Sequence, residues 1–191
     1  MRAPGLLFKR SHASFGAPPR SCTQSGREIH VEGGDPKALE ENKIANVEIR
    51  HCDKDGVYSE YTGQPGVSTD QSSMTFLRGL ETADAAGQVS LSTIYPGWYG
   101  GRATYIHIEV HLGGKIVTTT QMAFTDATNT AVSSSPLSLA KGQNPLTNGP
   151  DMMFSDGDEL QRANLSGDVT SGFTATPTIG IQRPVELSDR A

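Results

Sequence analysis

Alternation of apolar and polar residues is the dominant pattern in this chain, and it is clearest between residues 105 and 112. The even positions of this segment are aliphatic: Ile106, Ile108, Val110 and Leu112. The odd positions are polar or aromatic: Tyr105, His107, Glu109 and His111. Because successive side chains of a strand point to opposite faces, the segment predicts a strand with one face packed on a core. The polar face then either meets solvent or lines a site.

Other short segments show the same behaviour between clusters of turn residues. Strands are predicted within residues 27–37, 44–56, 87–97, 115–124 and 172–182. The pair Gly113-Gly114 separates two of these segments and predicts a hairpin. Residues 62–75 and 126–157 are rich in Gly, Pro, Ser and Asn and predict loops, and 158–165 predicts a loop or a modest helix. We therefore predict an all-β fold, a β-sandwich of mainly antiparallel strands with long loops.

Composition sets the domain organisation and excludes some partners. The chain has 191 residues, which suits a single domain, and we place that domain at residues 28–183. Residues 1–27 contain five basic residues and no acidic one, and predict a flexible tail, as do residues 184–191. The formal net charge of −5 does not suggest nucleic acid or an anionic membrane as a partner. No apolar run reaches membrane-spanning length and no clear signal peptide is present, so we expect a soluble protein, cytoplasmic or secreted.

Two cysteines, Cys22 and Cys52, allow a disulfide or two free thiols. A disulfide would close a loop of about 30 residues and contribute ~3–4 kcal/mol. The triplet His51-Cys52-Asp53 resembles a metal or thiol site, but neighbouring residues on a strand point to opposite faces. We therefore expect a structural role for this triplet.

Two tyrosines follow predicted turns: Tyr58 comes after Asp55-Gly56, and Tyr99 comes after Pro96-Gly97. Phenol has an ordinary pKa near 10 and is a poor ligand for soft ions, whereas a hard trivalent ion such as Fe(III) binds the phenolate oxygen. Together with His107, the two tyrosines would form a ferric site of oxygen and nitrogen ligands. The alternative is that each tyrosine packs at a sheet edge with its hydroxyl in water.

Three segments carry a resemblance to a known family: HCDKDGVYSEY at 51–61, TFLRGLETADAAGQVSLSTIYPGWYGGRATYIHIEV at 75–110, and QMAF at 121–124. Over residues 45–125 the chain resembles the intradiol ring-cleavage dioxygenases of the catechol and protocatechuate type, in their compact single-domain form. The resemblance implies a β-sandwich that holds a non-haem Fe(III) ion. It also implies a catechol-type diol and O2 as substrates, a muconate-type diacid as product, and no flavin or nicotinamide.

The same resemblance implies roles for individual residues. In the family, two tyrosinates and two histidines bind the iron, and by position these include Tyr58, Tyr99 and His107. Arg102 matches an active-site arginine that stabilises charge on the bound ring, and Gln121 matches a polar residue near the substrate. We expect a monomer or a homodimer.

Position 105 departs from the family pattern, because Tyr105 stands where the first motif histidine is expected. Tyr105 is either a third phenolate ligand or a protonated phenol that stays off the metal. A third phenolate lowers the charge of the metal and its ligands from +1 to zero, which weakens the attraction for a catecholate dianion. Arg50 also stands where compact members usually have tryptophan. The alternative function is therefore a catalytically degenerate relative that acts as a β-sandwich binding module.

Overall fold

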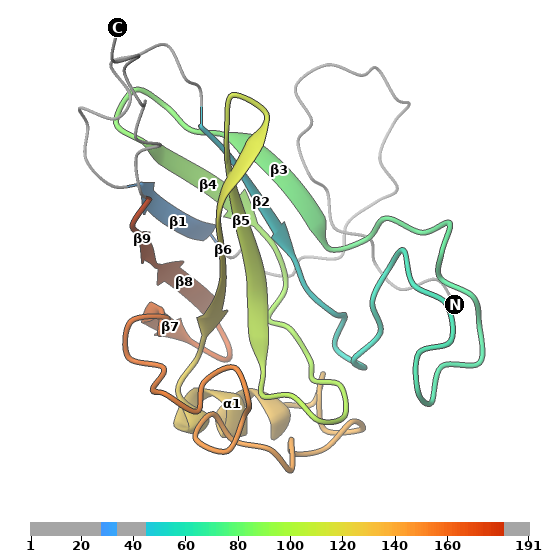
Figure 1. The fold of residues 1–191 in the computed structure, drawn as a ribbon. Helices are drawn as coiled ribbons and strands as arrows, with labels where there is room; N and C mark the ends of the chain where they lie inside the picture. Colours follow the sequence, from blue (N-terminus) through green and yellow to red (C-terminus); the bar gives the residue numbers. More distant parts are fainter. Residues whose placement is uncertain (1–27, 34–44, 182–191) are drawn as a thin grey trace, which may run out of the picture.

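The computed structural model describes residues 28–33 and 45–181, and within these ranges the chain is built mainly of β-strands (Figure 1). The described strands are β1 (Glu28–Gly33), β2 (Ala45–Arg50), β3 (Arg78–Thr82), β4 (Gln88–Ser92), β5 (Tyr105–Leu112), β6 (Lys115–Ala123), β7 (Asn164–Asp168), β8 (Gly172–Thr176) and β9 (Thr178–Ile179). One helix accompanies them in the described part, α1 (Asp126–Ser133). Within this part of the chain, no helix has the length and hydropathy needed to cross a membrane. The predicted tails at 1–27 and 184–191 lie outside the described residues, as does Cys22.

The strands form two sheets. The order in one sheet is β4-β1-β8-β7, with β9 paired to β1, and the order in the other is β3-β2-β5-β6. Neighbouring strands are antiparallel except that β1 runs parallel to β8 and to β9. The predicted all-β fold with mainly antiparallel strands is confirmed.

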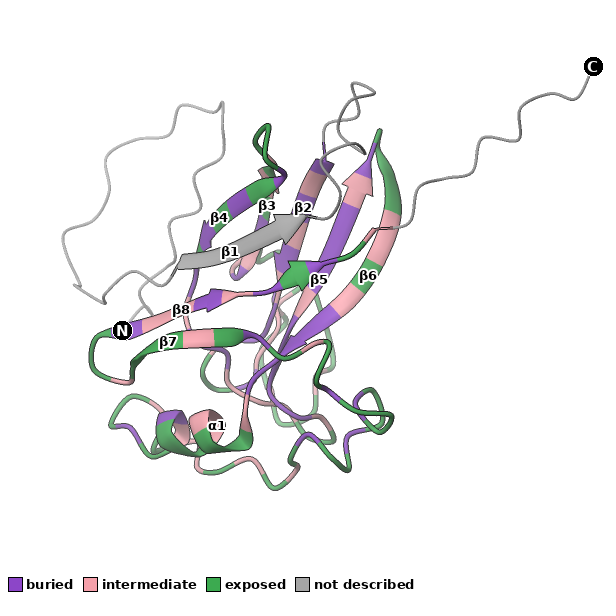
Figure 2. Cartoon of the chain, turned by 90° about the vertical axis from the view of Figure 1, so that its left-hand side faces the viewer, coloured by how far each residue is buried: buried purple, intermediate pink, exposed green. Residues whose placement is uncertain are grey.

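The hydrophobic core lies between the two sheets. The four-stranded sheet contributes Val47, Ile49, Ile106, Ile108, Val110 and Met122. The other sheet contributes Val89, Leu91, Ala175 and Ile179. Each fully buried aliphatic side chain stabilises the fold by about 1.5–3 kcal/mol relative to exposure. This burial fixes the aliphatic face of β5 inward, as the alternation predicts, and on the opposite face only His107 and His111 are partly exposed, so most of the strand is coloured as buried (Figure 2).

Strand register lines up polar residues across the outer face of the four-stranded sheet. The turn between β5 and β6 has positive φ at Gly113 and at Gly114, as a two-residue hairpin turn of the favoured type requires, and it confirms the predicted hairpin. On this register His107 lies opposite Gln121 on β6 and opposite Arg50 on β2. The three side chains therefore share one face of the sheet.

Three elements differ from the sequence-based expectation. Residues 126–133 form α1, not a loop, with Thr125 as its N-cap accepting a hydrogen bond from the backbone N–H of Thr128 at 3.1 Å. Only Val132 of α1 is buried, so the helix lacks the apolar stripe that periodicity detects. Strands β3 and β7 were also not predicted, and residues 158–165 contain turns and the start of β7. Helix α1 and the connections beside it lie at the end of the sandwich where β5 begins (Figure 1).

Candidate functional site

Three tyrosine side chains meet near the start of β5. Tyr58 lies in the connection between β2 and β3, Tyr99 in the connection between β4 and β5, and Tyr105 is the first residue of β5. The hydroxyl oxygens of Tyr99 and Tyr105 are 3.1 Å apart, which is hydrogen-bond distance. The rings of Tyr58 and Tyr99 pack edge to face with centroids 5.5 Å apart. The structure therefore gathers three of the four residues that the sequence predicts as metal ligands.

The hydroxyl of Tyr58 is a buried polar atom that makes no well-formed hydrogen bond among the described residues, although the hydroxyl of Tyr105 lies close enough to interact with it. Leaving such a group unsatisfied costs about 1–3 kcal/mol, so it calls for an explanation. The hydroxyl belongs to a cluster with two further phenol groups. A ligand or an ion bound to this cluster would satisfy it.

Two glycines hold the loops of the first two tyrosines against each other. Gly56 has a φ of +84°, and a Cβ at this position would collide with the carbonyl group of Trp98. Gly97 donates its N–H to the carbonyl of Asp53 at 3.0 Å, and a Cβ there would collide with the same carbonyl. Glycine is the residue that permits such close backbone contact. The two turns read from the sequence thus place the two tyrosines side by side.

Burial controls the protonation of the tyrosine cluster. It raises the pKa of Tyr58 well above the ordinary phenol value, and the nearby Cys52 and Tyr105 act in the same direction. Burial also raises the pKa of Tyr105, although Arg102 acts to lower it. Both groups are therefore neutral phenols at neutral pH unless a bound cation compensates the negative charge.

Arg102 lies beside this cluster and is held from three directions. Its Nη2 donates to Oε1 of Gln121 at 2.6 Å, and its Nε donates to Oδ2 of Asp151 at 2.9 Å. The guanidinium carbon lies 4.4 Å from the centroid of the Tyr105 ring, a cation–π arrangement. The structure thus brings the predicted residues Arg102 and Gln121 together and places them against the tyrosines.

Asp151 is a site residue that the sequence reasoning missed. Its side chain is fully buried and also accepts hydrogen bonds from the backbone N–H groups of Ala103 at 2.6 Å and Met153 at 2.8 Å. Burial acts to raise its pKa, but the hydrogen bonds from Arg102 and the two N–H groups hold the pKa below the ordinary value. Asp151 therefore remains ionised and fixes the guanidinium of Arg102. A lone aspartate in a polar loop gives no signal of this contact in the sequence.

His107 does not stand free on its strand. Burial lowers its pKa, so the ring is neutral, and its Nε2 lies 2.8 Å from Nη2 of Arg50 and 3.1 Å from Oε1 of Glu109. A guanidinium only donates hydrogen bonds, so Nε2 accepts from Arg50. A metal ion bound at Nε2 would need the same lone pair. That His107 binds a metal stays a prediction. A metal ion at Nε2 would have to displace the hydrogen bond from Arg50.

The triplet at 51–53 plays the structural part expected of it. His51 donates its Nδ1–H to the carbonyl of Cys52 at 2.8 Å, and Nε2 then accepts from the hydroxyl of Thr93 at 2.7 Å. Burial lowers the pKa of His51 to about 4 and raises that of Cys52 to about 12. The ring is thus a neutral core group, and the thiol is protonated and inert.

Comparisons with known proteins agree with this geometry at the level of the fold. No protein-family model and no curated relative matches the chain. Among solved structures, the chain is similar to an intradiol ring-cleavage dioxygenase from Tetranychus urticae, with 22% identity, a TM-score of 0.71, and coverage of 86% of this chain and 83% of that one. A second similar structure, described as a dioxygenase, has 23% identity, a TM-score of 0.72, and coverage of 87% and 84%. The chain therefore has the fold of the intradiol ring-cleavage dioxygenases.

Proposed function

We propose that the protein is a non-haem Fe(III) intradiol dioxygenase-like enzyme that cleaves a catechol-type aromatic diol with O2 to a muconate-type diacid. The observation that carries this proposal is the buried hydroxyl of Tyr58, without a well-formed hydrogen bond, beside the hydroxyl pair of Tyr99 and Tyr105. Phenolate oxygens are ligands for a hard trivalent ion. A ferric ion would satisfy all three hydroxyls at once.

The residues of the site fit such an ion, with one qualification about the fourth ligand. Tyr58 and Tyr105 supply oxygen donors whose raised pKa a trivalent charge would overcome, and Tyr99 supplies a third oxygen donor. His107 supplies a neutral imidazole only when its Nε2 exchanges Arg50 for the ion. The tyrosines would therefore form the core of the binding site.

Bound Fe(III) would supply the Lewis acidity and the electron-accepting capacity that make a bound catecholate reactive toward O2. Both oxygen atoms of O2 enter the diacid product, so no external reductant is needed. Arg102 places a fixed positive charge beside the cluster and would stabilise an anionic oxygen of the diol. Asp151 and Gln121 hold that charge in place through hydrogen bonds of 2.9 and 2.6 Å.

A second candidate function is a catalytically degenerate binding module that keeps the sandwich and the tyrosine cluster but has lost turnover. The contact between Arg50 and His107 favours it, because the guanidinium occupies the lone pair of one expected ligand. A site of three phenolates without an imidazole would also be less positive and attract a catecholate less.

The test is O2 consumption and diacid formation by the full chain loaded with Fe(III) and supplied with catechol. The proposal expects turnover that Tyr58→Phe reduces by at least tenfold. Tyr61→Phe is the matched control, because Tyr61 packs against Tyr58 at a centroid distance of 5.9 Å and is half exposed. Catechol binding without O2 uptake would support the binding module, and turnover that is equal in both variants would contradict a role for Tyr58.

A further inference from the structure

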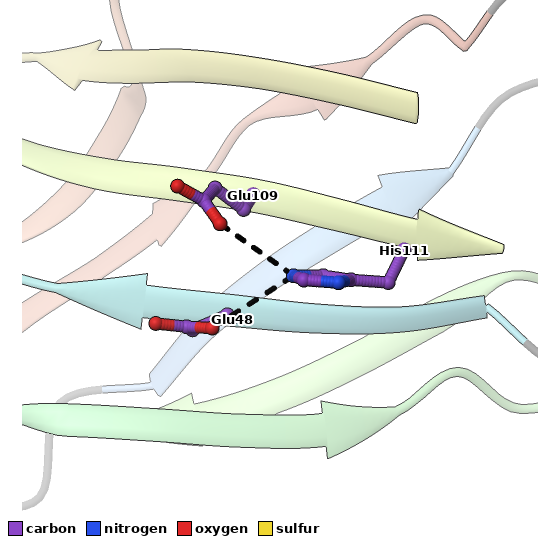
Figure 3. A group of neighbouring side chains, drawn as sticks. All are labelled: Glu48, Glu109 and His111. Atoms are coloured by element: carbon purple, nitrogen blue, oxygen red, sulfur yellow. Dashed lines mark ion pairs between the residues drawn. The ribbon is translucent and has the colours of Figure 1, made fainter. Parts of the chain in front are cut away.

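A second cluster of possible metal ligands lies farther along the outer face of the four-stranded sheet (Figure 3). It consists of Glu48 on β2 with Glu109 and His111 on β5. Glu48 and Glu109 lie directly opposite each other in the strand register. We propose that these three side chains bind a divalent transition-metal ion such as Zn²⁺, at a site separate from the tyrosine cluster.

The first observation is the state of His111. Its Nε2 is buried and has no hydrogen bond among the described residues, yet it lies 3.7 Å from Oε2 of Glu48 and 3.6 Å from Oε2 of Glu109. Figure 3 shows the ring pointing between the two carboxylates. A hydrogen bond would need about 3.2 Å or less. The nitrogen is therefore aimed at both oxygens at ion-pair distance, without a hydrogen bond to either.

These separations suit ligands that share an ion. With metal–ligand bonds of about 2.0–2.1 Å, two ligands of a tetrahedral ion lie about 3.4 Å apart. The ligand atoms of the cluster all lie within 4.8 Å of one another. Shifts of a few tenths of an ångström would therefore bring the two nitrogen–oxygen pairs, at 3.7 and 3.6 Å, to the separation expected of shared ligands.

Arg50 orients the two carboxylates without occupying the proposed position. Its Nη2 donates to Oε1 of Glu109 at 2.8 Å, and its Nη1 lies 3.7 Å from Oε1 of Glu48. Each carboxylate thus turns one oxygen to the guanidinium and the other oxygen to His111.

Alternation along β5 explains why His111 joins the cluster. His111 follows Glu109 by two residues on the same strand, so their side chains share one face of the sheet. Glu48 lies opposite Glu109, and the register of β2 and β5 runs on without a shift to His111. The imidazole therefore lies beside both carboxylates.

The donor set identifies the chemical class of the ion. One imidazole nitrogen with two carboxylate oxygens suits borderline divalent ions, above all Zn²⁺ and Co²⁺, and suits Ca²⁺ or Mg²⁺ less. The side chains of Glu48 and His111 are 28% and 21% exposed, which leaves room for water as a further ligand. Two carboxylates and one guanidinium carry one net negative charge, which favours a cation.

The experiment is titration of the untagged full chain, free of iron, with Zn²⁺ by calorimetry. The proposal expects one Zn²⁺ bound at this site, with affinity reduced at least tenfold in Glu48→Gln and in His111→Gln. Glu159→Gln is the matched control, because it removes the same charge from an exposed position and should bind like the unmodified chain. Tyr58→Phe should also retain Zn²⁺ binding, which separates this site from the tyrosine cluster.

Two further measurements distinguish loss of the metal site from misfolding of a variant. Zn²⁺ should raise the Tm of the unmodified chain and of Glu159→Gln but not that of His111→Gln. Bound Co²⁺ should give visible bands that His111→Gln lacks. Absence of Zn²⁺ binding would overturn the proposal. So would Glu48→Gln and His111→Gln variants that bind Zn²⁺ as tightly as the unmodified chain, or loss of binding in Tyr58→Phe.

Discussion

The guanidinium of Arg50 donates a hydrogen bond of 2.8 Å to Nε2 of His107, the histidine that the family resemblance matches to an iron ligand. The same Nη2 donates to Glu109 at 2.8 Å, so the arginine is anchored in this position. Arg50 lies opposite His107 in the register of β2 and β5. A cation therefore already holds the lone pair that a metal ion would need.

Replacing Arg50 should strengthen iron binding. In Arg50→Gln, the competing guanidinium and its positive charge are removed, and we expect Fe(III) affinity to rise about tenfold, because repulsion between nearby charges is worth about 1 kcal/mol or more. Competition with a chelator of known affinity measures the change. Lys115→Gln, which removes the same charge from an exposed position, should not alter the affinity. Equal affinities in both variants would show that Arg50 does not compete with the metal.

Replacing Tyr105 with histidine should favour catechol binding. Tyr105→His replaces a phenol by a neutral imidazole, which raises the charge of the metal and its ligands by one if Tyr105 binds as phenolate. We expect the Kd for catechol to fall about tenfold and O2 uptake to rise. Tyr105→Phe is the comparison, since it removes the oxygen and supplies no nitrogen. A Tyr105→His variant that gains neither iron affinity nor activity would count against residue 105 as the limiting position.

Asp151 should be essential for holding Arg102. Asp151→Asn leaves the guanidinium without its buried counter-ion, and breaking such a pair costs roughly 3 kcal/mol or more. We expect a lower free energy of unfolding in urea and at least tenfold weaker catechol binding. Asp156→Asn removes the same charge from an exposed position and serves as the control. Unchanged catechol binding in Asp151→Asn would show that Arg102 needs no such anchor.

His51 should make the stability depend on pH. Its pKa is about 4 in the folded protein and about 6.5 in an unfolded chain, so the unfolded state binds more protons between these values. The contribution of neutral His51 to the free energy of unfolding is fully present above about pH 6.5 and is lost as the pH falls toward 4. The total loss is on the order of 3 kcal/mol. Urea unfolding at several pH values measures this slope. His51→Gln should remove this part of the slope, and an unchanged slope would contradict the assignment.

The sequence predicted those parts of the molecule that depend on local pattern. The alternation along β5 predicted its aliphatic and polar faces, and Gly113-Gly114 predicted the hairpin. The resemblance named Tyr58 and Tyr99, which the structure places side by side. These features follow from side-chain period and turn chemistry, which act over a few residues.

Other parts depend on contacts between distant residues and gave no local signal. Asp151 meets Arg102 across 49 residues of chain, from within a polar connection. Arg50 meets His107 through the register of two strands that are separated by 57 positions. Strand β3 is not predicted by the sequence pattern, because it has no clear apolar face: its Leu80 is 58% exposed. Tertiary pairing, not local preference, decides each of these.

The most direct test of the central claim is the visible absorption spectrum of the purified protein loaded with Fe(III), with total iron measured on the same sample. We expect one iron per chain and a broad phenolate-to-iron charge-transfer band that weakens in Tyr58→Phe and in Tyr99→Phe but not in Tyr61→Phe. Added catechol should perturb this band. A protein that takes up no iron, or a band that survives unchanged in both tyrosine variants, would contradict the assignment of the tyrosine cluster as the metal site.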